Sequence, residues 1–128
     1  MKNVLRFSTM FTLALVLTLA SSFTFANVDN EKAIQKARSA VKNAAPDDWK
    51  TPFKSAKLFI RKNIFMYEAL SWLEKSIAIN KNVVNLELLG DCYYKMENNR
   101  QAMISYVEAF KQVIQKILIS ILWLLKKR

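Results

Sequence analysis

The sequence predicts an all-α protein made of antiparallel helical hairpins, with about five to six helices after an N-terminal leader. One glycine and two prolines among 128 residues leave few of the turns that a β-sheet needs. Apolar residues recur instead at intervals of three and four residues, the period of an amphipathic helix. Short breaks rich in asparagine and lysine separate these stretches and are typical of turns between helices. The length beyond the leader, about 100 residues, permits one domain with a modest core.

Residues 1–26 are predicted to be a secretory signal peptide. Lys2 and Arg6 give a basic start, residues 11–20 form an apolar core, and the small residues at the end suit cleavage before Asn27. The apolar core is about 10 residues long, whereas a membrane-spanning helix needs about 20, so cleavage is favoured over an uncleaved anchor. The sequence therefore predicts export, either to the periplasm or as a secreted protein, with membrane association as a further option.

The first helix after the leader is predicted over residues 31–44, inside a segment of helix and linker that spans residues 27–48. Its alanines recur at intervals of three and four, and Pro46 prevents the helix from continuing. The next helix is predicted to begin at Thr51 and Pro52. Here a capping hydroxyl would be followed by proline at the first helical position.

Four further helical stretches complete the hairpin region, residues 49–112, and the C-terminal segment. They are predicted over residues 66–79, 84–96, 100–112 and 113–125, with the last two continuous. Asparagines stand at the breaks, and asparagine tolerates the left-handed conformation with which many helices end. Of Asn98 and Asn99, one is expected to close a helix and the other to cap the next.

A spacing pattern recurs within the hairpin region. Its fullest copy consists of Leu86, Leu89, Gly90, Tyr93, Ala102, Tyr106 and Ala109, and a trio 33 residues before the last three consists of Ala69, Leu73 and Ser76. The pattern resembles the tetratricopeptide (TPR) repeat, a helical hairpin used mainly to hold other proteins. Small residues in these positions let paired helices approach closely, and we expect Gly90 to face Ala102.

The resemblance implies a protein–protein interaction module, but other interpretations remain open. The earlier unit is degenerate, because Lys57 occupies the place of Gly90, and an ordinary helical bundle can show the same alanine spacing. Residues 69–77 are also similar to the helical C-terminal part of a group of exported bacterial proteins of unassigned function. Those proteins carry a β-rich region ahead of their helices, so this likeness would make the chain a truncated remnant of a larger exported protein.

The composition argues against a catalytic or metal site. The sequence contains no histidine, which removes the commonest metal ligand and the commonest general base together. Cys92 is the single cysteine, and its helical apolar surroundings suit a core residue. The acidic pair Glu87 and Asp91 shares a helix face but has no third acid beside it. We therefore predict no enzymatic activity, no metal and no cofactor, and we expect no binding of nucleic acid.

Another protein is the predicted partner, and the charge balance favours an acidic one. Lysine and arginine number 20 against 10 acids, for a net charge of +10, although solubility alone would also explain this excess. In the TPR architecture the first helix of each hairpin lines the concave surface. The resemblance therefore implies the following partner-binding residues: Lys54, Lys57, Arg61, Asp91, Tyr94 and Lys95.

Residues 113–128 form an apolar segment with a basic end. It is either a capping helix that covers the last hairpin, a membrane-active helix that lies in an interface, or an altered C-terminus. Residues 113–125 would reach about 20 Å as a helix, less than the ~30 Å of a hydrocarbon core. The alternative function is thus a membrane-surface-associated protein held by this segment. Its lipid contacts would be Ile117, Leu118, Ile121, Leu122, Trp123, Leu125, Lys126, Lys127 and Arg128.

Overall fold

A computed structural model describes residues 29–127, and within this range the chain consists of helices and connecting turns with no β-strand. The helices are residues 29–42, α2 (Lys50–Lys62), α3 (Met66–Ile79), α4 (Val83–Lys95) and α5 (Asn99–Lys126). The predicted all-α class is confirmed. The predicted signal peptide and its cleavage site lie outside the described residues.

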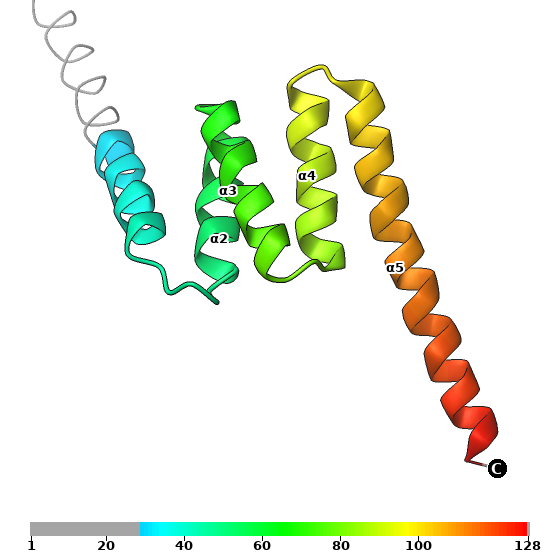
Figure 1. The fold of residues 1–128 in the computed structure, drawn as a ribbon. Helices are drawn as coiled ribbons and strands as arrows, with labels where there is room; N and C mark the ends of the chain where they lie inside the picture. The colour runs from blue at the N-terminus through cyan, green and yellow to red at the C-terminus, as the bar shows by residue number, and fades with distance from the viewer. Residues whose placement is uncertain (1–28, 128) are drawn as a thin grey trace, which may run out of the picture. The chain divides into compact units, whose positions relative to one another are not determined.

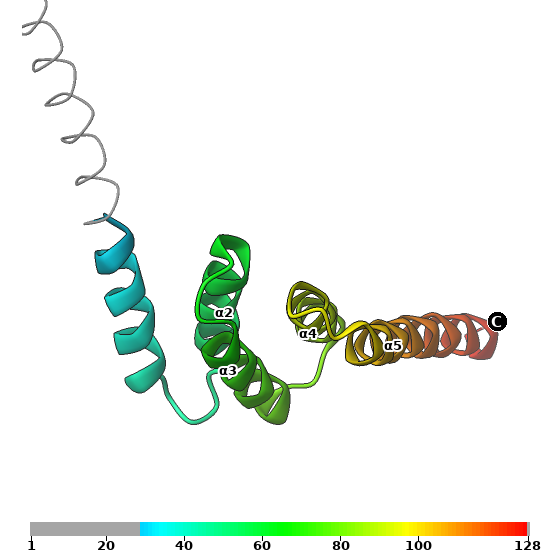
Figure 2. The ribbon, with the colours of Figure 1, turned by 90° about the horizontal axis from the view of Figure 1, so that it is seen from above.

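The chain divides into two units, residues 1–38 and residues 39–128, and the boundary falls within the helix over residues 29–42. In the first unit, the Gln35 side-chain amide donates a hydrogen bond of 3.0 Å to the Glu31 carboxylate one helical turn earlier. In the second unit, α2 packs against α3 and α4 packs against α5, as two antiparallel hairpins (Figure 1). Contacts of α3 and of α2 with α4 join the two hairpins (Figure 2).

An aspartate caps the start of α2, not the predicted threonine. The Asp48 carboxylate accepts hydrogen bonds from the backbone N–H groups of Lys50, at 2.9 Å, and Thr51, at 3.1 Å. The Thr51 hydroxyl is a donor, at 2.6 Å, to the other oxygen of the same carboxylate. Pro52 is therefore the third residue of the helix and not the first. It still lies in the first turn, where a backbone N–H would have no helical partner.

A buried polar cluster fixes the turn between α3 and α4. Asn82 and Asn85 cap α4 reciprocally, each side chain accepting from the other's backbone N–H, at 3.2 and 3.0 Å. The Asn85 amide also donates to the Asn80 carbonyl at 2.7 Å, and the Ser76 hydroxyl donates to the Trp49 carbonyl at 2.9 Å. Asn85 and Ser76 are fully buried. The cluster thus ties both ends of this turn to the segment before α2.

The helix ends differ in detail from the prediction. Asn80, expected to be left-handed, is extended with φ −150°. Left-handed residues are instead Asn63 (φ 55°), Phe65 (φ 46°) and Glu97 (φ 60°). After α4, the N–H groups of Glu97 and of the following asparagine bond back to the carbonyls of Tyr94 and Tyr93, which closes the helix. Asn98 then caps α5, as expected for one asparagine of that pair, by accepting from the Gln101 N–H at 3.3 Å.

Phe59 and Leu73 are the largest apolar side chains that are fully buried, and Phe59 stacks on the Trp72 ring with centroids 4.8 Å apart. In the second hairpin, small residues of α5 face α4. Gly90 of α4 lies against the ring of Tyr106, since a methyl group added at Gly90 would come within 3.0 Å of three ring atoms. Gly90 was expected to face Ala102, but the closest approach to the glycine is made by the Tyr106 ring, which lies one turn further along α5.

The predicted continuity of the last two helical stretches is found in α5, a single helix of 28 residues. Its C-terminal part runs past the end of α4 (Figure 1). Every described side chain from Val113 onward is exposed. The capping interpretation of this segment is therefore not the arrangement found, because it covers no part of the hairpin. Among the described residues, no helix has both the length and the apolar character needed to cross a membrane.

Candidate partner-binding groove

The first helices of the two hairpins, α2 and α4, enclose a groove of about 330 Å³. Seven residues line it: Lys57, Ile60 and Arg61 from α2, and Leu88, Asp91, Tyr94 and Lys95 from α4. Intervals of three and four residues place each set on a single face of its helix. The groove thus follows from the parallel placement of two amphipathic helices.

The groove has an apolar floor and a basic rim. Ile60 and Leu88 are 3% and 7% exposed. Around them Lys57, Arg61 and Lys95 are exposed, and none of them forms an ion pair with an acid in the part of the chain that the structure describes. Side chains of this kind attract an anionic group and are hydrated until one arrives. A ligand with an acidic group beside an apolar one would match both parts of the groove.

Asp91 is the acidic member of the lining, and it has a partner in the neighbouring helix. Its carboxylate accepts a hydrogen bond of 2.8 Å from the Tyr106 hydroxyl of α5. Burial, together with this hydrogen bond and the negative charge of Asp91, raises the pKa of Tyr106 to about 12. The pair links one wall of the groove to the second helix of the same hairpin. Tyr106 therefore both fills the space over Gly90 and positions Asp91.

A second hollow, of about 560 Å³, lies at the turn between α4 and α5. Its lining residues are Tyr94, Lys95, Glu97 and Asn99. It shares Tyr94 and Lys95 with the groove, so the two hollows meet at these side chains. Tyr94 is 66% exposed and offers a large ring at this junction.

Five of the six residues predicted to contact a partner line the groove, and Lys54 does not. Lys54 is exposed on α2, one turn before Lys57. The spacing argument did not find the floor residues Ile60 and Leu88. Helical spacing would have indicated both residues, because each stands three residues from a predicted contact residue on the same helix. The prediction, however, considered only charged and aromatic residues.

The predicted repeat-packing residues are mostly in the core. Leu73 is fully buried, as are Ala69 and Ser76 on the same face of α3, and Leu86 is 4% exposed. Leu89 and Tyr93 are half-buried, whereas Tyr106 is 39% exposed, because its hydroxyl reaches out to Asp91. The buried small residues are Ala69, Ser76, Gly90, Ala102 and Ala109.

Cys92 of α4 lies against the start of α3 and has core character. Its sulfur is fully buried and lies 3.9 Å from the Met66 carbonyl oxygen. Burial, with a smaller contribution from Glu74, raises the pKa of the Cys92 thiol to about 11. The thiol is therefore protonated at neutral pH and poorly nucleophilic. Across residues 29–127, no three side chains of His, Cys, Asp or Glu gather in a way that could hold a metal ion.

Compared with known proteins, the chain matches no family model, no curated sequence and no solved structure.

Proposed function

We propose that this chain is an exported protein-interaction module without catalytic activity, whose groove between α2 and α4 binds a segment of another protein. The observation that carries this proposal is the groove itself, with an apolar floor of Ile60 and Leu88 under a rim of cations that form no ion pair with an acid among residues 29–127. Export rests on the sequence of residues 1–26 alone. The TPR-like character of the hairpins rests on residue spacing, and their packing is compatible with it.

The partner segment is expected to carry an acidic residue next to an apolar one. Lys57 and Arg61 lie one helical turn apart on α2, and Lys95 approaches from the opposite wall. A carboxylate placed between these walls would gain interactions from both helices, while an apolar neighbour would cover the floor. Asp91, held by the Tyr106 hydroxyl, would reject a second acid at its own position and so define a register for the bound segment.

The test uses random peptides displayed and selected on the purified chain, followed by affinity measurement of the enriched sequences. Enriched peptides should combine Asp or Glu with an adjacent apolar residue. Reversal of two rim charges, Lys57→Glu with Arg61→Glu, should weaken their binding by about tenfold or more, because attraction becomes repulsion.

The matched control makes the same change in charge outside the groove, at Lys75→Glu with Lys111→Glu, two exposed lysines on α3 and α5. Its affinity should stay within about threefold of the unchanged chain, since charges separated by more than a Debye length are largely screened. If both double variants lose affinity equally, the net charge and not the groove governs binding. If the enriched peptides are neutral, the assignment of an acidic partner is wrong.

A further inference from the structure

One apolar face runs along the whole of α5, across the hairpin and beyond it. Its hairpin part consists of Met103, Val107 and Phe110, and the spacing of four and three residues continues through the tail at Ile114, Ile117, Ile121 and Leu124. These seven side chains are between 41% and 64% exposed. The surface is thus much longer than the apolar segment that the sequence indicates, because it includes the outer side of a helix already packed in the fold.

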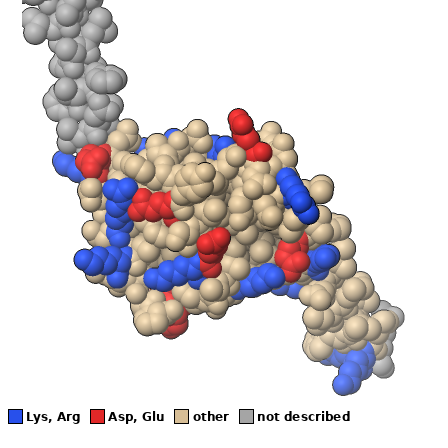
Figure 3. Space-filling view, turned by 45° about the horizontal axis from the view of Figure 1, so that its top comes forward, with Lys and Arg blue, Asp and Glu red and all other residues tan. Residues whose placement is uncertain are grey.

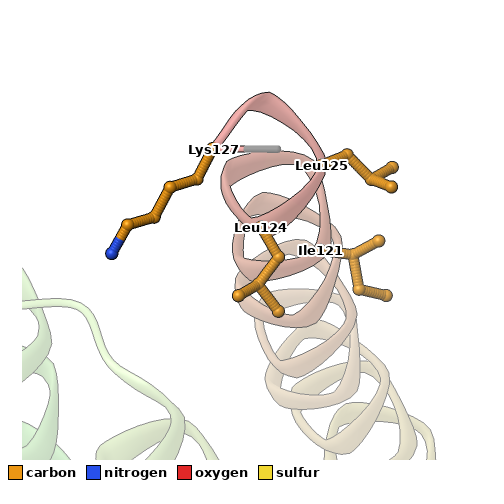
Figure 4. Close-up of a pocket in the computed structure, with 4 residues that line it drawn as sticks. All are labelled: Ile121, Leu124, Leu125 and Lys127. Carbon is orange, nitrogen blue, oxygen red and sulfur yellow. The ribbon is translucent and has the colours of Figure 1, made fainter.

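A neighbouring side of α5, about a third of a turn away from this apolar face, packs against α4 in the hairpin. Ala102, Ser105 and Ala109 are buried on that side. The same line of the helix continues, at intervals of three, four and seven residues, through Lys116, Ser120, Trp123 and Lys127. Figure 4 shows Ile121 and Leu125 projecting to the side of the helix away from Lys127. The helix therefore keeps one apolar face from end to end, beside a line that is packed in the hairpin and that mixes polar residues with Trp123 in the tail.

The charge of this region identifies what can cover the apolar face. From Ala109 to the C-terminus the sequence contains no acid and five basic residues, namely Lys111, Lys116, Lys126, Lys127 and Arg128. In the space-filling view, the described end of α5 is an uncharged surface that ends in basic side chains (Figure 3). A surface that is both apolar and basic is complementary to an anionic lipid interface, where hydrocarbon lies below a layer of negative headgroups.

A second copy of the chain would match this surface less well. It would bring the same basic residues into the contact, and like charges repel. Lys127 places its ammonium group 5.0 Å from the centre of the Trp123 ring. Tryptophan and lysine together are typical of the headgroup level of a membrane.

We propose that the outer face of α5, from Met103 to Leu125, lies flat in the interface of a membrane that contains anionic lipid. The line that carries Lys116, Ser120, Trp123 and Lys127 then lies at the level of the headgroups and of the water above them. Because α4 packs on that side of α5, the wall of the groove that α4 carries is held away from the lipid. The two sites lie on different surfaces, so peptide binding and lipid binding can fail independently.

The test uses the full chain with Trp49→Phe, Trp72→Phe and Trp123→Phe together with Ile117→Trp, which leaves a single tryptophan and places it on the apolar face. On addition of vesicles of phosphatidylcholine mixed with phosphatidylglycerol, the emission of this tryptophan should shift to shorter wavelength and be quenched by lipids brominated near the headgroup end of their chains. Vesicles of phosphatidylcholine alone should give a much smaller effect. This tryptophan reports only on the tail, so any lipid binding by residues 1–26 cannot produce this signal.

Two variants with the same charge change separate the two sides of the helix. Ile121→Glu places an acid on the apolar face, and Ser120→Glu places it on the water side; both residues are exposed, so neither change opens the core. Ile121→Glu should weaken vesicle binding at least about tenfold more than Ser120→Glu, because it also removes an apolar side chain that the lipid would otherwise cover. Binding of the acidic peptides in the groove should be unchanged in both.

Three results would overturn the proposal. Equal loss in the two variants would show adsorption by charge alone. No change in the emission of the tryptophan placed at position 117 on addition of anionic vesicles would show that the tail does not enter the interface. Sedimentation showing self-association without lipid, abolished by Ile121→Glu and not by Ser120→Glu, would mean that a second copy covers this face.

Discussion

Gly90 and Tyr106 form a contact whose energy can be isolated with three variants. A Cβ atom added at Gly90 would lie 2.6 Å from Cδ1 and 2.7 Å from Cζ of the Tyr106 ring, where ordinary contact begins at 3.4 Å. Because Cε1 of the ring lies closer still, the ring must then move by at least about 0.8 Å, against its hydrogen bond to Asp91. We expect an overpacking cost of about 1–3 kcal/mol. The higher helix propensity of alanine offsets about 1 kcal/mol of this overpacking cost.

We predict that the effect of Gly90→Ala on the free energy of unfolding changes sign when the Tyr106 ring is removed. Gly90→Ala in the unchanged chain should lower the free energy of unfolding by up to about 2 kcal/mol, the difference of those two effects. In a Tyr106→Ala background the ring is absent, so Gly90→Ala should raise the free energy of unfolding by about 1 kcal/mol. The free energies come from urea unfolding followed by circular dichroism, in a double-mutant cycle. The same effect of Gly90→Ala in both backgrounds would refute the assignment of Tyr106 as the residue that excludes a side chain at position 90.

Two further predictions concern buried polar groups. Asn85→Ala removes one partner of the reciprocal cap and the shorter of the two amide hydrogen bonds to the Asn80 carbonyl, which keeps the one from Asn82. Urea unfolding should show a loss of about 1–3 kcal/mol, against about 0.5–2 kcal/mol for the exposed cap change Asn98→Ala; equal losses would mean that the buried cluster adds nothing to capping. Because the folded-state pKa of Tyr106 is raised from 10.0 to about 12, the folded chain holds this proton more tightly than the unfolded one. Its contribution to stability should be complete below pH 10 and be lost as the pH rises toward 12, and Tyr106→Phe should reduce this loss in unfolding measured across that range; an unchanged pH dependence in that variant would contradict the shift.

The helices themselves were largely predictable. The stretch over residues 66–79 was predicted with the bounds that α3 has, and the bounds of α4 differ by one residue at each end. Both results follow from apolar residues repeating with the helical period between polar breaks. The cap of α4 was less predictable, because Asn82 and Asn85 stand among several neighbouring residues that have equally good capping side chains.

The candidate groove was predicted in part, for a physical reason that its residues make clear. Spacing alone placed Lys57 and Arg61 on one face of α2, since the helix period fixes that face. Whether Lys54 shared the groove depended on how far α4 extends along α2, which is a long-range property. The hydrogen bond from Tyr106 to Asp91 joins residues 15 apart and likewise has no local signal.

The sequence by itself determined the helical class, the positions of the helices and the apolar, basic character of the C-terminal segment, because these depend on composition and on local periodicity. Only the tertiary structure decided which residues meet. It placed the Tyr106 ring over Gly90, buried Asn85 in the first turn of α4, and left one face of α5 uncovered from Met103 to Leu125. Burial is a property of neighbours that are distant in the chain, so helical periodicity can mark an apolar face but cannot show what, if anything, packs against it.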